Sequence, residues 1–270
     1  MDKITKLLTD ERSQKRFANA VSSVLRRSGY TVKMHSCYFC TVSDGEYSVD
    51  MDYSYLGYGF NDLSVREVSE KALRAAKLEF ETLGRLTSFT NGQNFLRFKA
   101  IAPESVTDDM ITEDFPGGIK KVMCYTSDNI HGRILGREYM KKWDIPLKVL
   151  FSVADRNMSM HFERLRHKIS NLGSKKCAEF TSDSTDFGAS LVMCTDLYRH
   201  VSPIAGERFI VCIPSFDSFV AIEEPVERDT KLIADEMWDE DRRWSDSLTA
   251  SVYLFTPQGT EVIPPPEFIR

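Results

Sequence analysis

The stretch GASLVMCTDLYRHVSPIAGERFIVCIPSFDSFVAIEE, residues 188–224, decides the fold of this chain. Its apolar residues recur at helical spacing over 189–201, which predicts a helix there. Two strands, 208–213 and 218–223, are then expected to form a hairpin about the turn Pro214-Ser-Phe-Asp217. Both strands are almost continuously apolar, which indicates that both faces of the hairpin are covered. We therefore expect this stretch to be the centre of a unit that combines helices with antiparallel strands.

The composition is that of an ordinary globular protein. The chain has 270 residues, of which 42% are hydrophobic and 28% charged, enough for one large domain or two modest ones. The formal charge of −5 argues against general binding along a nucleic-acid backbone, which needs clustered positive charge. The N-terminal segment shows no apolar core with a cleavage pattern, and no apolar run approaches the length of a bilayer span. We expect a cytoplasmic protein that does not associate with membranes.

The first expected unit, residues 1–102, contains a helix, a hairpin, a second helix and a strand, at 10–27, 38–42 with 46–51, 64–83 and 95–101. Asp44-Gly45 is the favoured pair for a tight type I′ turn between the two hairpin strands. Ser64 and Glu67 have the spacing of a capping box, in which each side chain bonds the other residue's backbone N–H.

The second expected unit, residues 119–264, follows a polar, acidic stretch at 103–118 that we interpret as a linker. Its centre is the helix and hairpin of 189–223. Its other expected elements are the strands 120–125, 251–255 and 260–263, helices at 134–143 and 162–169, an apolar segment at 147–153, and a long last helix from Asp229 to Leu248. The predicted fold class is α+β, with antiparallel hairpins backed by helices in two subdomains.

The order of these segments resembles the YtpQ-like bacterial proteins, a family of unknown function. The resemblance rests on FANAVSSVLRRSG and YSVDMDYSYL near the N-terminus, and on DFGASLVMCTDLYRHV and FIVCIPSFDSFVAI near the C-terminus. In that family an acidic turn leads into a helix, and the strand that follows ends in a Pro with an Asp three residues later. Asp186, Ala189, Pro214 and Asp217 match those positions, whereas residues 85–150 depart from the pattern. The resemblance implies a fold and a bacterial cytoplasmic setting, and no activity.

Cys37-x-x-Cys40 is the one motif with the spacing of a metal or redox pair. A structural zinc site needs a second pair of ligands, and a redox pair needs a strand-to-helix setting. Here the two cysteines fall in or just before a strand, where residues three apart point to opposite faces. We interpret the six cysteines as structural thiols, with a metal or redox pair as the alternative, and predict no cofactor.

No catalytic set is predicted. The chain lacks the G-x-S-x-G elbow and a glycine-rich phosphate loop, and Ser190 is expected to belong to the start of a helix. The alternative is an enzyme with an acidic, metal-dependent site formed by Asp183, Asp186 and Asp217, which share one edge if the hairpin folds beside the helix. The competing interpretation is that these carboxylates cap the helix and the turn.

The predicted partner-binding residues are Trp238, Arg242 and Trp244, on the acidic last helix, because Trp and Arg dominate binding hot spots. The basic stretch 164–168 is a second candidate, for an acidic partner or nucleic acid. A full-sized core without a convergent catalytic set favours a non-catalytic protein. We therefore expect it to bind another protein in an adaptor, immunity or regulatory role, rather than nucleic acid or a membrane.

Overall fold

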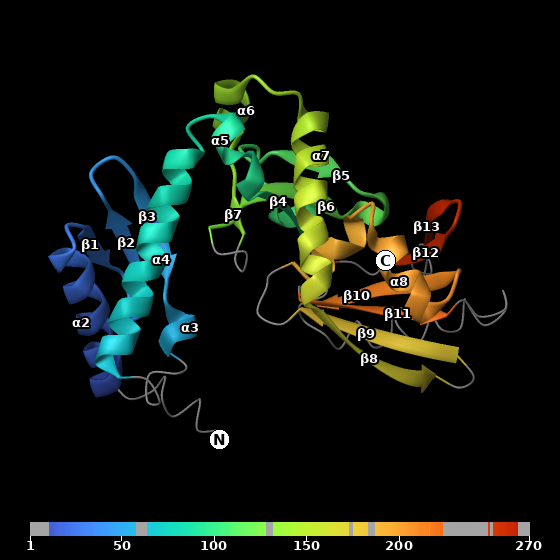
Figure 1. The fold of residues 1–270 in the computed structure, drawn as a ribbon, viewed down its shortest axis with the longest axis horizontal. Coiled ribbons are helices and arrows are strands. Elements are labelled where there is room, and N and C mark those ends of the chain that lie inside the picture. The colour runs from blue at the N-terminus through green and yellow to red at the C-terminus, as the bar shows by residue number, and fades with distance from the viewer. Residues whose placement is uncertain are drawn as a thin grey trace. The chain divides into compact units, whose positions relative to one another are not determined.

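The computed structural model describes residues 11–57, 64–127, 132–172, 175–182, 187–215, 217–223, 248 and 251–263. The chain divides into two compact units, residues 1–87 and 88–270 (Figure 1). Each unit combines helices with antiparallel strands, which confirms the predicted α+β class. The division lies earlier than residue 102, because strand β4 (Leu96–Ile101) pairs with β6 (Lys120–Tyr125) inside the second unit.

The first unit contains a three-stranded antiparallel sheet of order β1-β2-β3, with α2 packed against β1 and α4 packed against α2. The apolar residues of α2 fall one turn apart, so Phe17, Val21 and Leu25 are all buried. The Phe17 ring lies 5.0 Å from that of Tyr38, and Tyr30 stacks on Phe80 at 5.2 Å. The elements are α2 (Glu11–Arg27), β1 (Thr31–Met34), β2 (Phe39–Ser43), β3 (Ser48–Asp52), α3 (Ser54–Gly57) and α4 (Val65–Arg85).

In this unit the predicted capping box is confirmed, and a turn forms at Asp44-Gly45 as predicted. The turn is not of type I′, which requires positive φ at both residues, because Asp44 does not have it. Asp44 Oδ1 accepts hydrogen bonds from the backbone N–H groups of Glu46 and Tyr47, and Gly45 adopts φ +100° in the turn between β2 and β3. At the start of α4, Ser64 Oγ accepts from the Glu67 N–H at 3.2 Å, and Glu67 Oε2 accepts from the Ser64 N–H at 2.7 Å. The capping box is therefore present in full.

The first sheet of the second unit has the order β4-β6-β5, with β7 (Arg133–Ile134) also paired to β6. The predicted linker at 103–118 is wrong, because Thr112–Asp114 forms β5 and Ile111 is buried. Cross-strand ion pairs hold the two weak strand formers of β5: Lys121 lies 3.5 Å from Glu113, and Lys120 pairs with Asp114. The accompanying helices are α5 (Phe89–Gly92), η1 (Gln93–Phe95), η2 (Pro103–Ser105), η3 (Pro116–Gly118), α6 (Arg137–Trp143), α7 (Leu147–Met158) and η4 (Ser159–Arg164).

The second sheet is six-stranded and antiparallel, in the order β13-β12-β10-β11-β9-β8. The predicted hairpins of the C-terminal half are confirmed, and the central pair β10 and β11 is buried along most of its length. Its strands are β8 (Leu165–Leu172), β9 (Lys175–Ser182), β10 (Phe209–Ser215), β11 (Ser218–Glu223), β12 (Val252–Thr256) and β13 (Gly259–Ile263).

The helix predicted at 162–169 is wrong. The 3₁₀ helix η4 ends at Arg164, and β8 begins at Leu165 and pairs with β9 through eight residue pairs. Leu165 and Ile169 are four residues apart, which fits a helix, but with His167 they also fit the two-residue period of a strand. The partner strand β9 decides between the two periods.

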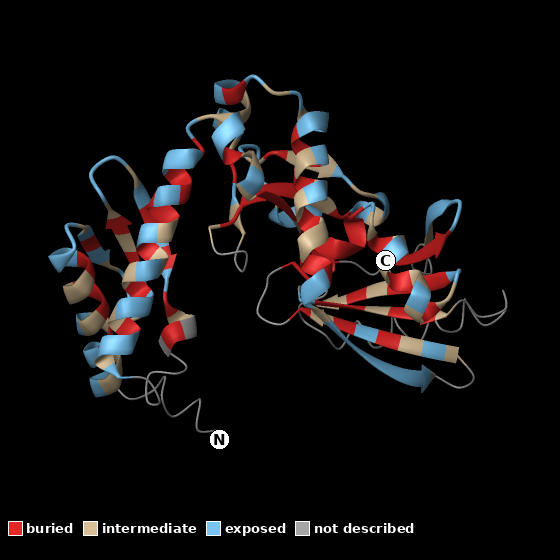
Figure 2. Ribbon diagram, viewed as in Figure 1, coloured by how far each residue is buried: buried red, intermediate tan, exposed pale blue. Residues whose placement is uncertain are grey.

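The continuous helix predicted at 189–201 is confirmed only from Leu197 onward. Residues Ala189–Met193 form the 3₁₀ helix η5, Cys194 is extended at ψ 143°, and the α-helix α8 covers only Leu197–Ala205. All five residues of η5 are buried, because η5 packs on β4 of the first sheet and on β10 and β11 of the second (Figure 2). A segment covered on every side gains nothing from the amphipathic pattern of a surface helix.

Ser190 lies in the first turn of η5 and links η5 to strand β4. Its Oγ is buried and accepts a hydrogen bond from the backbone N–H of Ala100 in β4 at 2.9 Å. We expect Ser190→Ala to lower the free energy of unfolding by about 2 kcal/mol, because it leaves a buried N–H without its acceptor. Urea denaturation would measure the loss, and exposed Ser152→Ala should change stability by less than about 0.5 kcal/mol. Equal effects of the two variants would contradict this role.

The last predicted helix, from Asp229, lies outside the described residues apart from Leu248, which is buried. Within the part of the chain that the structure describes, no helix is long and apolar enough to span a bilayer.

Candidate functional site

Asp217, the described member of the predicted acidic edge, has a structural role in the β10–β11 turn. Its Oδ1 accepts a hydrogen bond from Ser215 Oγ at 2.6 Å, and its backbone oxygen accepts from the Ser182 N–H at 2.9 Å. Asp183 and Asp186 lie outside the described residues. Among the residues that are described, no three His, Cys, Asp or Glu side chains gather closely enough to hold a metal ion. The contacts of Asp217 fit the interpretation as a turn residue.

The cysteines are free thiols, and three of them, Cys40, Cys124 and Cys194, are buried. Burial, and to a smaller extent the nearby charge of Asp50, raises the pKa of Cys40 to about 11. Burial also raises the pKa of Cys194 well above its ordinary value. Both thiols therefore stay protonated at neutral pH, whereas a nucleophilic cysteine needs the thiolate.

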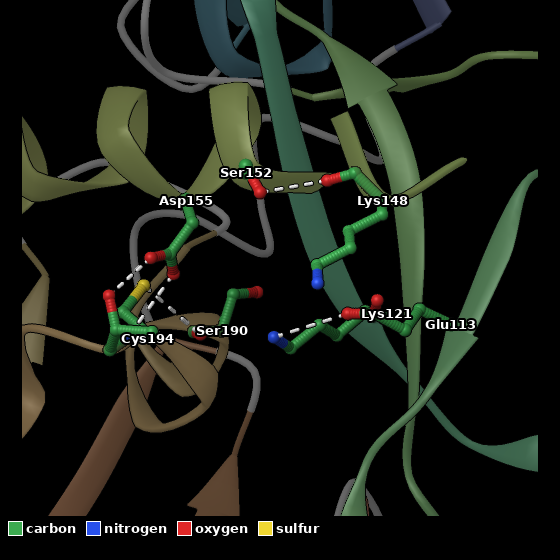
Figure 3. A network of polar contacts seen from close by, with 8 residues as sticks. Glu113, Lys121, Lys148, Ser152, Asp155, Ser190 and Cys194 are labelled. Carbon is green, nitrogen blue, oxygen red and sulfur yellow. Dashed lines mark hydrogen bonds and ion pairs between the residues drawn. The ribbon is translucent and has the colours of Figure 1, made fainter. Parts of the chain in front are cut away.

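A network of polar contacts around α7 ties that helix to the segment between η5 and α8 (Figure 3). Asp155 accepts hydrogen bonds from the backbone N–H of Thr195, at 3.2 Å, and from its hydroxyl. Ser159 Oγ donates to Asp196 Oδ2 at 2.6 Å. Each of these contacts satisfies a polar group in the segment where η5 ends and α8 begins. The network therefore accounts for where α8 starts, and it does not pair groups for a reaction.

A buried cation that the sequence analysis missed lies in β4. Arg97 is 3% exposed; its Nε donates to His161 Nε2 at 3.3 Å, and its Nη1 donates to the backbone oxygens of Asn94 and Leu96. Burial lowers the pKa of Arg97 to about 10, which leaves it charged at neutral pH. His161 belongs to η4, the segment directly before β8. This contact therefore anchors the start of β8 to the β4-β6-β5 sheet. Because the two residues are 64 positions apart, the sequence gives no signal for their contact.

The exposed strand β8 is the most unusual surface of the second unit. Within the described part of the chain its one neighbouring strand is β9, so β8 forms an edge of the six-stranded sheet. Residues 166–171 are all exposed, on both faces of the strand, as the pale blue of β8 in Figure 2 shows. An edge strand directs alternate backbone N–H and C=O groups away from its neighbour.

The two faces of β8 differ in chemistry. The register places His167 opposite Phe180 and Ile169 opposite Ala178, so these β8 residues continue the face on which Phe180 stacks on Phe219. Phe180 and Ala178 are buried, but Ile169 is 56% exposed. The apolar face of the sheet therefore continues into solvent at β8.

The opposite face of β8 is basic. Arg166 lies opposite Thr181 and Lys168 opposite Glu179, so the two cations share this face. From residue 163 to residue 176 the chain carries the five cations Arg164, Arg166, Lys168, Lys175 and Lys176 against the one acid Glu163. The basic stretch 164–168 that the sequence singled out is thus brought to a sheet edge inside a protein of net charge −5.

The predicted partner-binding residues Trp238, Arg242 and Trp244 lie outside the described residues. Comparisons with models of known protein families, with curated proteins and with solved structures find no match for this chain.

Proposed function

We propose that this protein is a non-catalytic binding protein and that the edge strand β8 is where another protein docks. The observation that carries the proposal is an eight-residue edge strand with exposed side chains on both faces. At about 3.4 Å per residue such a strand offers an edge of roughly 27 Å. Proteins usually shorten, twist, cover or charge an edge of this length, and the cations of β8 disfavour pairing with a second copy while leaving the edge open to an acidic partner.

The chemistry of the described residues supports a binding role over catalysis. The groups with the largest pKa shifts, Arg97, His161, Cys40 and Cys194, are buried and take part in packing. The exposed groups of β8 are cations beside an apolar residue. An extended segment that adds to a sheet edge gains main-chain hydrogen bonds for affinity and side-chain contacts for specificity. The exposed β8 backbone offers the main-chain hydrogen-bonding groups, and the side chains on its two faces offer the specific contacts.

The resemblance to the YtpQ-like proteins suggests a bacterial cytoplasmic setting, in which an adaptor, immunity or regulatory role fits a binding protein. Trp238, Arg242 and Trp244 remain the sequence-based prediction for a further contact with the partner.

Site-specific photocrosslinking in cells of the source organism tests the docking site. A photoreactive amino acid at position 168 in β8 is expected to trap one discrete protein adduct, which mass spectrometry would identify. The matched control is position 77 in α4, an exposed lysine of the first unit that should give no adduct. Absence of a discrete adduct at position 168, or the same adduct from both positions, would contradict the proposal.

A further inference from the structure

The two faces of β8 also specify what kind of segment it binds. Resting on the proposed docking role, we infer that the partner supplies an extended segment in which apolar and acidic side chains alternate. Side chains of a strand added beside β8 would fall on the same two faces as those of β8 itself, because the side-chain period of a strand is two residues.

The apolar half of the pattern follows from Ile169. Its side chain is 56% exposed beside buried Ala178, on the face that holds the Phe180–Phe219 stack. An apolar residue opposite Ile169 would extend this face by one strand and remove the isoleucine from water.

The acidic half follows from Arg166 and Lys168. They lie on the other face of the strand, where Lys168 stands opposite Glu179 in the register. Carboxylates on a neighbouring strand would stand opposite these cations, and opposite charges across a strand pair stabilise it. The strand conformation therefore places the two cations of this basic stretch two residues apart on one face of β8, so a complementary segment needs acidic residues with the same two-residue period.

A second copy of this chain is a poor occupant of the edge. Antiparallel pairing of β8 with itself about His167 would place Arg166 opposite Lys168, and like charges directly opposite each other destabilise a strand pair. Lysine on an edge strand commonly prevents such self-pairing. The same cations favour an acidic segment, so the charge of β8 discriminates between the two occupants.

Nucleic acid is also a weaker occupant. It would use the cations of one face but neither the exposed backbone edge nor Ile169. Single-stranded nucleic acid binds on aromatic platforms, and among the exposed residues 166–171 of β8 His167 is the one aromatic side chain.

Binding of designed peptides to the full chain tests this inference. The probes are three fluorescent ten-residue peptides with capped ends: alternating valine and glutamate, alternating valine and lysine, and a block peptide with the composition of the first. We expect the valine–glutamate peptide to bind about tenfold more tightly than the other two at low salt, with the preference shrinking as salt rises. Fluorescence anisotropy would measure the affinities.

Charge reversal separates this pairing from general attraction. In the double variant Arg166→Glu and Lys168→Glu, the preference is expected to invert in favour of the valine–lysine peptide. The matched control, Arg74→Glu and Lys77→Glu on exposed positions of α4, changes the total charge equally and should keep the original preference. Circular dichroism would verify that both variants are folded.

Several results would overturn the inference. They are equal binding of all three peptides, an unchanged preference after charge reversal, a β8-dependent dimer in sedimentation, or binding of a single-stranded oligonucleotide that the same variant abolishes. A protein adduct at position 168 together with a negative peptide result would leave the docking role standing and reject the alternating pattern. Absence of the adduct together with preferential binding of the valine–glutamate peptide would reject the docking role in cells and leave the peptide preference of β8 standing.

Discussion

Replacing Gly188 with alanine is expected to destabilise the second unit by about 3 kcal/mol, near the upper end for overpacking a core. A Cβ at this position would overlap the carbonyl carbon and oxygen of Asp217 and lie 2.8 Å from its Cα. All three are backbone atoms of the β10–β11 turn, so no side chain can rotate to make room. The turn would have to move, and the hydrogen bond from the Ser182 N–H to the Asp217 oxygen, 2.9 Å long, would move with it.

Gly84→Ala is the matched control for this prediction. Gly84 lies in α4, and an added Cβ there would meet nothing within 4 Å. Alanine is the better helix former, so this substitution is expected to stabilise the first unit by up to about 1 kcal/mol. Urea denaturation followed by circular dichroism would measure both changes. If Gly188→Ala is as stable as the wild type, the close approach of the β10–β11 turn to residue 188 is wrong.

The fit of Gly188 against Asp217 gives a physical basis to the sequence pattern around them. The glycine before η5 and the aspartate after Pro214 are 29 positions apart, yet they are in direct backbone contact. Asp217 therefore matters through its place in a turn that packs on a glycine. This interpretation explains both residues by packing and assigns neither of them a catalytic role.

Local signals in the sequence predicted local structure well. The capping box of Ser64 and Glu67 and a turn at Asp44-Gly45 formed as expected, because each depends on hydrogen bonds between residues at most three apart. The continuous apolar runs of β10 and β11 also indicated the buried hairpin correctly. In these cases the interactions that decide the structure join residues that are close together in the sequence.

The predictions failed where a distant partner decides the structure. Strand β5 is built from Thr-Glu-Asp, and its two weak strand formers, Glu113 and Asp114, pair with Lys121 and Lys120 of the neighbouring strand. Strand β8 carries a pattern that suits either a helix or a strand until β9 pairs with it. The sequence showed that residues 164–168 are basic, but only the sheet order shows that they lie at an edge.

The stability of the second unit is expected to fall in acid because of His161. Its side chain is 1% exposed, and burial, together with the nearby charges of Arg97 and Arg164, lowers its pKa from 6.5 to about 3. Nε2 accepts a hydrogen bond from Arg97, so the proton of the neutral ring resides on Nδ1, a buried atom with no partner among the described residues. A second proton would add a charge beside a buried guanidinium.

The direction of the effect follows from the two pKa values. Between pH 6.5 and about 3 the histidine of the unfolded chain binds a proton that the folded protein excludes. The free energy of unfolding therefore falls as the pH is lowered through this window, by up to about 1.4 kcal/mol per pH unit from this group. Above pH 6.5 both states are neutral at this position, so its contribution there is constant.

His161→Gln tests this account, because glutamine offers an acceptor for Arg97 and does not titrate. The variant is expected to be less stable than the wild type at pH 7.5, owing to altered packing against Phe187, whose ring lies 4.6 Å from that of His161. Its stability should nevertheless fall less steeply than that of the wild type between pH 6.5 and 4. Exposed His167→Gln is the matched control and should keep the wild-type slope. Parallel pH profiles for His161→Gln and the wild type, from urea denaturation at each pH, would show that this buried imidazole does not control the acid stability of the unit.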